Sequence, residues 1–143
     1  MNHKKAILMA VVGLAVAAPT AQANAKNSIQ PGRTFFHTVT AGQHPNKLVI
    51  LHNGTGIIQQ INHIGIAGSG GYVFTLAANT VLLSSQKLPR CTVGMVLPAG
   101  TSCAMDVRVH TTRPGWWRSV LSVTYTSGNF NSGELEAHVV AAS

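Results

Sequence analysis

Apolar and polar side chains alternate with a period of two in residues 104–111 and again in residues 116–126. Because successive side chains of a β-strand point to opposite faces of a sheet, this period predicts two strands, each with one buried face. It assigns Trp117 to the core and Trp116 to the outside. The four residues between the stretches read Thr-Arg-Pro-Gly, which is typical of a turn, so we expect the two strands to form a hairpin.

The rest of the chain after residue 26 has a similar character. No period of 3.6 residues persists over a helical length, and short β-branched runs are separated by turn residues. The turn Asn-Gly-Thr-Gly at residues 53–56 is the strongest of these breaks, since Asn and Gly tolerate a positive φ. Seven or eight strands at this spacing predict an all-β protein, an antiparallel β-sandwich. The further strands are expected at residues 34–40, 47–52, 57–66, 72–76, 81–84 and 134–141.

The N-terminus has the three parts of a secretory signal peptide. Residues 3–5 are basic, residues 6–18 form an apolar run, and small residues precede a cleavage site after Ala25 or Ala23. A membrane-anchoring helix is the alternative. The apolar run has 13 residues, whereas about 20 are needed to span a bilayer, so the length favours a cleaved signal.

Composition limits the domain organisation. Of 143 residues, 45% are hydrophobic and only 9% are charged, which is too apolar for a disordered chain. We expect a signal peptide at residues 1–25 and a single domain at residues 26–143. That domain carries eight Lys and Arg against three Asp and Glu, a net charge of about +5. The sequence therefore predicts a periplasmic or secreted protein, without stable membrane insertion once the signal is cleaved.

The two cysteines, Cys91 and Cys103, lie in the expected domain. An even number of cysteines in an exported chain indicates a disulfide, and closing a loop of this length contributes about 3 kcal/mol. The alternative is a metal site. Zinc would need two more ligands, and no His is adjacent to either Cys.

A series of motifs runs through residues 47–126. They are the Asn-Gly-Thr that ends residues 49–55, the aromatic pair Tyr72 and Phe74, Cys91, the turn Pro-Ala-Gly-Thr-Ser-Cys at residues 98–103, Val107, Val109, Pro114-Gly115, Leu121 and Val123. In this order the motifs resemble one family, the immunoglobulin-like domains of the abnormal-spindle/hydin (ASH) type found in bacterial choice-of-anchor D exported proteins. The chain departs from the family at residues 109–111, Val-His-Thr, where Phe-x-Pro is usual, and it has one copy instead of a tandem array.

The resemblance implies an immunoglobulin-like sandwich that acts as a binding or structural module, and it brings no catalytic residues. It also implies a disulfide between Cys91 and Cys103. The matching turn residues would be Asn53, Gly54, Gly100 and Gly115.

The expected hairpin carries the candidate partner-binding residues, which are Arg108, His110, Arg113, Trp116 and Arg118. Arginine offers planar, bidentate recognition of anionic groups, and an exposed Trp adds stacking and cation–π contacts. The alternative is a solvated strand face on which the Arg stems cover apolar neighbours.

The last expected strand alternates as well, with Leu135, Ala137 and Val139 inward. Glu134, Glu136 and His138 would point outward. The two carboxylates would neutralise the basic patch if this strand lies beside the hairpin.

Metal binding, hydrolysis and nucleic-acid binding have less support in the sequence. Six histidines in the expected domain are scattered, although a metal site with Met95 or Met105 as a soft ligand is conceivable. A hydrolase would have to work with only Asp106, Glu134 and Glu136 as carboxylates. Nucleic-acid binding is not expected, because eight basic residues without a concentrated run make a thin footprint.

We therefore expect an exported, non-enzymatic protein-binding or structural module without a cofactor. Its partner would be another envelope or surface protein, recognised through a strand edge or the hairpin face. A subunit of a larger surface or secretion assembly is the most specific form of this hypothesis. The alternative is a periplasmic binding module for an anionic glycan or a metal ion.

Overall fold

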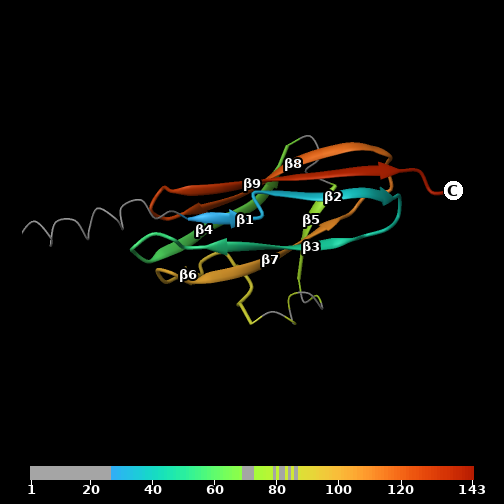
Figure 1. The fold of residues 1–143 in the computed structure, drawn as a ribbon. Helices are drawn as coiled ribbons and strands as arrows, with labels where there is room; N and C mark the ends of the chain where they lie inside the picture. The colour runs from blue at the N-terminus through green and yellow to red at the C-terminus, as the bar shows by residue number, and fades with distance from the viewer. Residues whose placement is uncertain (1–26, 69–72, 79, 81–82, 84, 86) are drawn as a thin grey trace, which may run out of the picture.

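The computed structural model describes residues 27–68, 73–78, 80, 83, 85 and 87–143. In these residues the chain forms nine strands in two sheets that pack face to face (Figure 1). This arrangement confirms the expected all-β sandwich. The expected signal peptide lies outside the described residues, as do all but one of residues 81–84, where a further strand was expected.

The two sheets differ in size. The four-stranded sheet has the order β1 (Ser28–Gln30), β3 (Asn46–His52), β7 (Ser102–Val109), β5 (Phe74–Ala77). The five-stranded sheet has the order β2 (Arg33–Thr40), β9 (Phe130–Val140), β8 (Gly115–Tyr125), β4 (Gln59–Ala67), β6 (Val96–Leu97). Among the described residues, no helix is both long and apolar enough to cross a lipid bilayer.

The first two strands are consecutive in sequence but belong to different sheets. β1 pairs antiparallel with β3, whereas β2 pairs parallel with β9, so that Arg33 lies beside Glu134. The sequence pattern predicted antiparallel pairs throughout and seven or eight strands. A parallel neighbour 101 positions away leaves no local signal, and strands as short as β1 and β6 are too brief to show a period.

The expected hairpin of β7 and β8 is wrong, because the two strands lie in different sheets. β7 is bonded to β3 on one side and to β5 on the other, so neither of its edges is available to β8. The five residues between Val109 and Gly115 instead carry the chain from one sheet to the other. On β7 Met105, Val107 and Val109 share the buried inner side as predicted, and β8 keeps the predicted alternation. The alternation records only which face is buried and not which strand is the neighbour.

The core lies between the sheets. The inward residues of β8 and β9 have the predicted phase, and Trp117 packs against the core while Trp116 is 63% exposed, as predicted. Each fully buried Leu or Val side chain contributes about 1.5–3 kcal/mol. The largest buried apolar side chains include Phe74, Leu51, Ile61, Leu97, Leu121 and Leu135.

The predicted disulfide is present. Cys91 and Cys103 are bonded, with their Cα atoms 5.0 Å apart, and both side chains are buried. The backbone N–H of Cys91 donates to the carbonyl of Ala104. The bond therefore holds the segment before β6 against the start of β7.

The alternation of residues 104–111 puts Asp106 of β7 on the face opposite Met105 and Val107, yet Asp106 is only 1% exposed. Its Oδ2 accepts hydrogen bonds from the Asn46 amide and the Thr80 hydroxyl, both at 2.6 Å. Thr80, which follows β5, thus covers this part of the solvent side of the four-stranded sheet. An alternating pattern cannot reveal such a cover.

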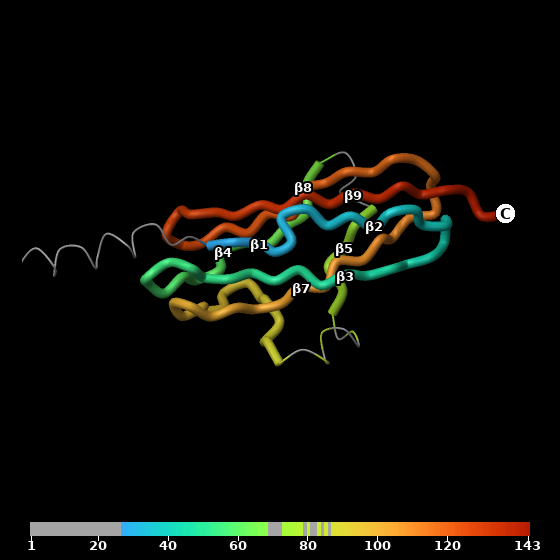
Figure 2. The backbone as a smooth tube through the Cα atoms, in the orientation of Figure 1, coloured from blue at the N-terminus to red at the C-terminus, as the bar shows by residue number. Residues whose placement is uncertain are grey.

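Asn53 fixes one end of the sandwich and is fully buried. Its amide nitrogen donates to the carbonyls of Ile57 at 2.9 Å and Leu97 at 2.8 Å, while its side-chain oxygen accepts from Thr55. Its backbone also bonds to Thr101 and Gly100. The predicted turn after β3 is therefore tied to β6 and to the turn before β7. In Figure 2 these turns and the β8–β9 turn meet at the end of the molecule where β1 lies.

Candidate functional site

The solvent side of the five-stranded sheet, which we call the outer face, is formed mainly by β8 and β9. The two strands pair antiparallel, and residues directly opposite one another share a face. The outward pairs are Trp116 with His138, Arg118 with Glu136, Val120 with Glu134, Ser122 with Ser132 and Thr124 with Phe130. Parallel pairing with β2 adds Arg33 and Phe35 to this face.

An aromatic stack lies at one end of the outer face. The rings of Trp116 and His138 are 4.1 Å apart at their centroids and within 3° of parallel. Because His138 covers one side of the indole, Trp116 stays fixed on the sheet although most of its surface is exposed. On the inner side Trp117 donates its indole N–H to the carbonyl of Arg113 at 3.0 Å. The stack therefore offers a rigid aromatic surface to a partner.

An ion cluster lies beside the stack. Glu136 accepts a hydrogen bond from Arg33 Nη2, and its Oε2 is 3.3 Å from Arg118 Nε. Arg33 Nε also lies 3.9 Å from Glu134 Oε2. The hydrogen bond and the attraction to Glu136 raise the pKa of Arg33 above its ordinary value. Two guanidinium groups cover Glu136, so its side chain is only 7% exposed although it points outward.

The cluster changes the electrostatic character that the sequence suggested. Arg33 and Arg118 contribute two positive charges, and Glu134 and Glu136 contribute two negative charges. The neutralisation that was expected if the last strand lay beside the basic residues is therefore observed. Around Arg118 the outer face is a balanced charge cluster and not a bare cationic patch.

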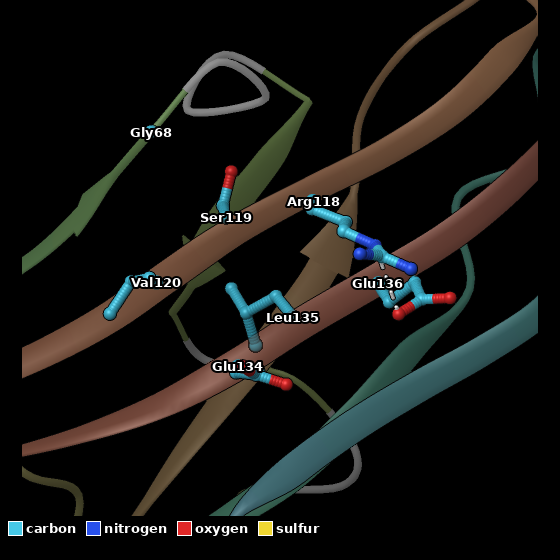
Figure 3. Close-up of a pocket in the computed structure, with 7 residues that line it drawn as sticks. All are labelled: Gly68, Arg118, Ser119, Val120, Glu134, Leu135 and Glu136. Carbon is cyan, nitrogen blue, oxygen red and sulfur yellow. Dashed lines mark ion pairs between the residues drawn. The ribbon is translucent and has the colours of Figure 1, made fainter.

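A shallow pocket of about 220 Å³ opens beside this cluster (Figure 3). It forms where β4 ends and Gly68 turns away with φ +114°, and a Cβ at Gly68 would lie 3.4 Å from Ser119 Cα. The Ser119 hydroxyl is buried and has no hydrogen-bond partner among the described residues. The volume is below the about 300–1,000 Å³ of small-molecule sites, so the pocket suits one side chain of a partner better than a cofactor.

The five candidate residues predicted from the sequence do not lie together in the structure. Trp116 and Arg118 lie together on the outer face, and Arg113, in the connection between the sheets, has its guanidinium carbon 5.8 Å from the Trp117 ring centre. Arg108 belongs to the four-stranded sheet, opposite Asn46 and Thr75. His110 stacks on His44 at 5.1 Å. The prediction that the five residues form one patch was wrong, because it assumed that β7 and β8 form a hairpin.

Other residues of the site were not found from the sequence. Arg33 and Phe35 reach the outer face only through the parallel pairing of β2 with β9. His138 was predicted to point outward, but its stacking on Trp116 depends on the register of β8 with β9. The alternation in β9 was a usable signal for the outward direction of His138 and Glu136.

Metal-ligand clusters and catalytic groups are the other arrangements that could form a site. In the described part of the chain no group of three or more His, Cys, Asp or Glu side chains is placed to hold a metal ion. His52 Nδ1 lies 2.7 Å from Ser102 Oγ on the neighbouring strand. A hydrolytic triad would need a carboxylate, and the three carboxylates of the chain bond elsewhere, Asp106 to Asn46 and Thr80 and the two glutamates to arginines.

Comparison with solved structures shows the fold. The chain is similar to the ASH/PapD-like domain 7 of human CEP192, with a TM-score of 0.54 and 11% identity over 83% of this chain and 88% of that domain. It is also similar to the SrpA adhesin of Streptococcus sanguinis, with a TM-score of 0.52 and 10% identity over 82% of this chain and 59% of the adhesin. These likenesses support an immunoglobulin-like sandwich related in shape to ASH domains.

The secreted serine protease VesC from Vibrio cholerae is similar as well, with a TM-score of 0.58 and 12% identity over 87% of this chain. The chain spans only 25% of the length of VesC, and about a third of the related protease VesB. No protein-family model matches the sequence, and no curated protein sequence matches it either. At these identities the likeness concerns the fold alone.

Proposed function

We propose that this chain is an exported, non-enzymatic protein-binding module whose contact surface is the outer face around Trp116. The observation that carries the proposal is the exposed Trp116 ring, held flat on His138 beside two arginines. Protein interfaces are enriched in aromatic residues and Arg and depleted in Lys. The outward residues of β2, β8 and β9 follow this composition, with two Arg and no Lys.

Two further features support a protein as the partner. A rigid aromatic side chain loses little conformational entropy on binding, which makes Trp a frequent anchor of interfaces. The ion cluster can exchange partners, because Arg118 is 75% exposed and keeps donors free for a partner carboxylate. A partner with an acidic side chain beside an apolar one would bind Arg118 and pack on the Trp116 ring.

The proposal is tested by capturing partners from the cell envelope after mild crosslinking, with mass spectrometry as the readout. The double variant Trp116→Ser, Arg118→Ser is expected to lose at least about tenfold of the captured partner. Lys47→Ser is the matched control, because it removes one exposed positive charge from the other sheet. Equal capture by both variants would reject the outer face as the contact surface.

The glycan alternative has its own supporting observation. Sugars stack on flat exposed indoles, and the Trp116–His138 stack with a neighbouring Arg suits an anionic glycan. A change in tryptophan fluorescence on adding glycan fragments, lost in Trp116→Ser, would favour this alternative. The metal alternative has no ligand set among the described residues.

A further inference from the structure

Exposed apolar side chains gather at one end of the sandwich. Seven large hydrophobic side chains are exposed in the described part of the chain, and five of them lie in turns or at strand ends at this end of the sandwich. The five define what we call the apolar end, and they are Ile57 (64% exposed), Ile58 (63%), Val93 (62%), Val96 (50%) and Phe130 (69%).

Hydrogen bonds hold the segments of the apolar end together. The Asn53 amide bonds to the carbonyls of Ile57 and Leu97, which joins the turn after β3 to β6. The Gln60 side chain donates to the Gly94 carbonyl at 3.2 Å, and Gln60 is opposite Val96 in the β4–β6 pair. The isoleucines and valines therefore lie on neighbouring segments and keep a fixed arrangement.

Phe130 belongs to the same end because of the β8–β9 turn. The Ser127 hydroxyl donates to the Gln59 side chain at 2.8 Å, and Tyr125 at the end of β8 is opposite Ile61. Figure 2 shows these turns together, on the side from which β1 starts. Apolar exposure concentrated in this way marks a contact surface, whereas single exposed residues do not.

The apolar end carries no carboxylate. Asp106 is buried within β7, and Glu136 is engaged by Arg33 and Arg118 on the outer face. Glu134 lies four residues along β9 from Phe130, a distance of about 13 Å. With a domain charge of about +5, an anionic surface would meet no acidic repulsion here.

The position of the chain start indicates what this end faces. The Asn131 amide donates to the Asn27 carbonyl at 3.0 Å, and Ser28 pairs with His52 next to the Asn53 turn. Asn27, the first described residue, therefore lies at the apolar end. Only eight residues separate Asn27 from the apolar run of residues 6–18, and they reach at most about 30 Å when extended. While that run is in a bilayer, the apolar end is the part of the domain held nearest to it.

We infer that the apolar end docks peripherally on an anionic lipid bilayer. Aliphatic side chains and one Phe at turns and strand ends can enter the headgroup boundary without leaving backbone groups unpaired. If the signal is cleaved after Ala25, Lys26 and the new amino group directly precede Asn27 in the sequence and contribute positive charge to the domain. The five side chains of the apolar end do not include Trp116 or Arg118, the residues on which the proposed function rests, so the docking does not depend on the proposed function.

Vesicle flotation tests this inference. All nine strands and the disulfide lie in residues 26–143, so this fragment is used, with thermal melting to check that it is folded. The wild-type fragment is expected to float with phosphatidylglycerol-containing vesicles. Ile57→Asn with Ile58→Asn should weaken binding at least about tenfold at unchanged net charge, and Val93→Asn should weaken it in the same direction. Trp116→Ser, on the outer face, is the matched control and should bind normally.

Three outcomes would overturn the inference. The wild-type fragment could fail to bind anionic vesicles, the isoleucine variant could bind as well as wild type, or crosslinks from the apolar end could lead to an envelope protein. Because the partner capture depends on Trp116 and Arg118 and the flotation depends on Ile57 and Ile58, failure of either proposal leaves the other testable.

Discussion

Arg118 and Glu136 face each other across the β8–β9 pair, and this contact buries a carboxylate on the solvent side of a sheet. Arg33 closes the cluster from β2. The cluster thus joins three strands of the five-stranded sheet and lies beside the aromatic stack that we propose as the contact surface.

Glu136→Gln is expected to lower the free energy of unfolding by about 1 kcal/mol. Both arginines stay largely hydrated when the carboxylate charge is removed. The loss in the free energy of unfolding is therefore near the upper limit of what an exposed ion pair contributes. Glu134→Gln is the control, because Glu134 is 72% exposed and 3.9 Å from Arg33. Urea denaturation of both variants gives the comparison, and equal stability would contradict a structural role for Glu136.

Asn53→Ala is expected to lower the free energy of unfolding by about 2–3 kcal/mol, because it leaves the buried Leu97 carbonyl and neighbouring groups without their hydrogen-bond partner. Asn62→Ala, at an exposed position of β4, is the control and should change stability by less than about 0.5 kcal/mol. Chemical denaturation measures both. A small loss of stability in Asn53→Ala would mean that water molecules replace the hydrogen bonds of the Asn53 side chain.

Replacing Cys91 and Cys103 together by Ala is expected to lower the free energy of unfolding by about 3 kcal/mol, chiefly because the unfolded chain gains entropy. Calorimetry of the variant against the oxidised protein measures the shift in Tm. A loss below about 1 kcal/mol would show that the surrounding hydrogen bonds already hold the segment before β6 in place.

Burial raises the pKa of Tyr125 to about 12, above its ordinary value of 10.0. The unfolded state therefore releases the phenol proton first as the pH rises, so this contribution to stability is complete below pH 10 and is lost between about pH 10 and 12. Tyr72→Phe leaves Tyr125 as the one tyrosine, and the absorbance of tyrosinate follows its titration. A midpoint near pH 10 in the folded protein would contradict the burial.

Much of the fold could be predicted because the signals for it are local. Alternation placed Trp117 inward and Trp116 outward, and Leu135, Ala137 and Val139 against the core. The two cysteines predicted the disulfide, and the Asn-Gly sequence predicted the turn at Asn53. Each of these features depends on residues close in the chain or on residue type alone.

The candidate site could be predicted only in part. Trp116 and Arg118 were found because both follow from the alternation of one strand. Arg33 and the stacking of His138 were missed, and Arg108 and His110 were grouped with the wrong sheet. The convergence of Ile57, Val93 and Phe130 at one end was likewise invisible, because their segments are far apart in sequence.

The sequence by itself determined the all-β class, the face on which each strand buries its side chains, and the disulfide. Only the tertiary structure decided that β7 and β8 separate into two sheets, that β2 runs parallel to β9, and that Glu136 is covered by two arginines. The physical reason is that side-chain direction follows from backbone geometry at each residue. Strand partners are chosen by backbone hydrogen bonds that are nearly the same for any pair of strands, so packing of the whole core makes the choice.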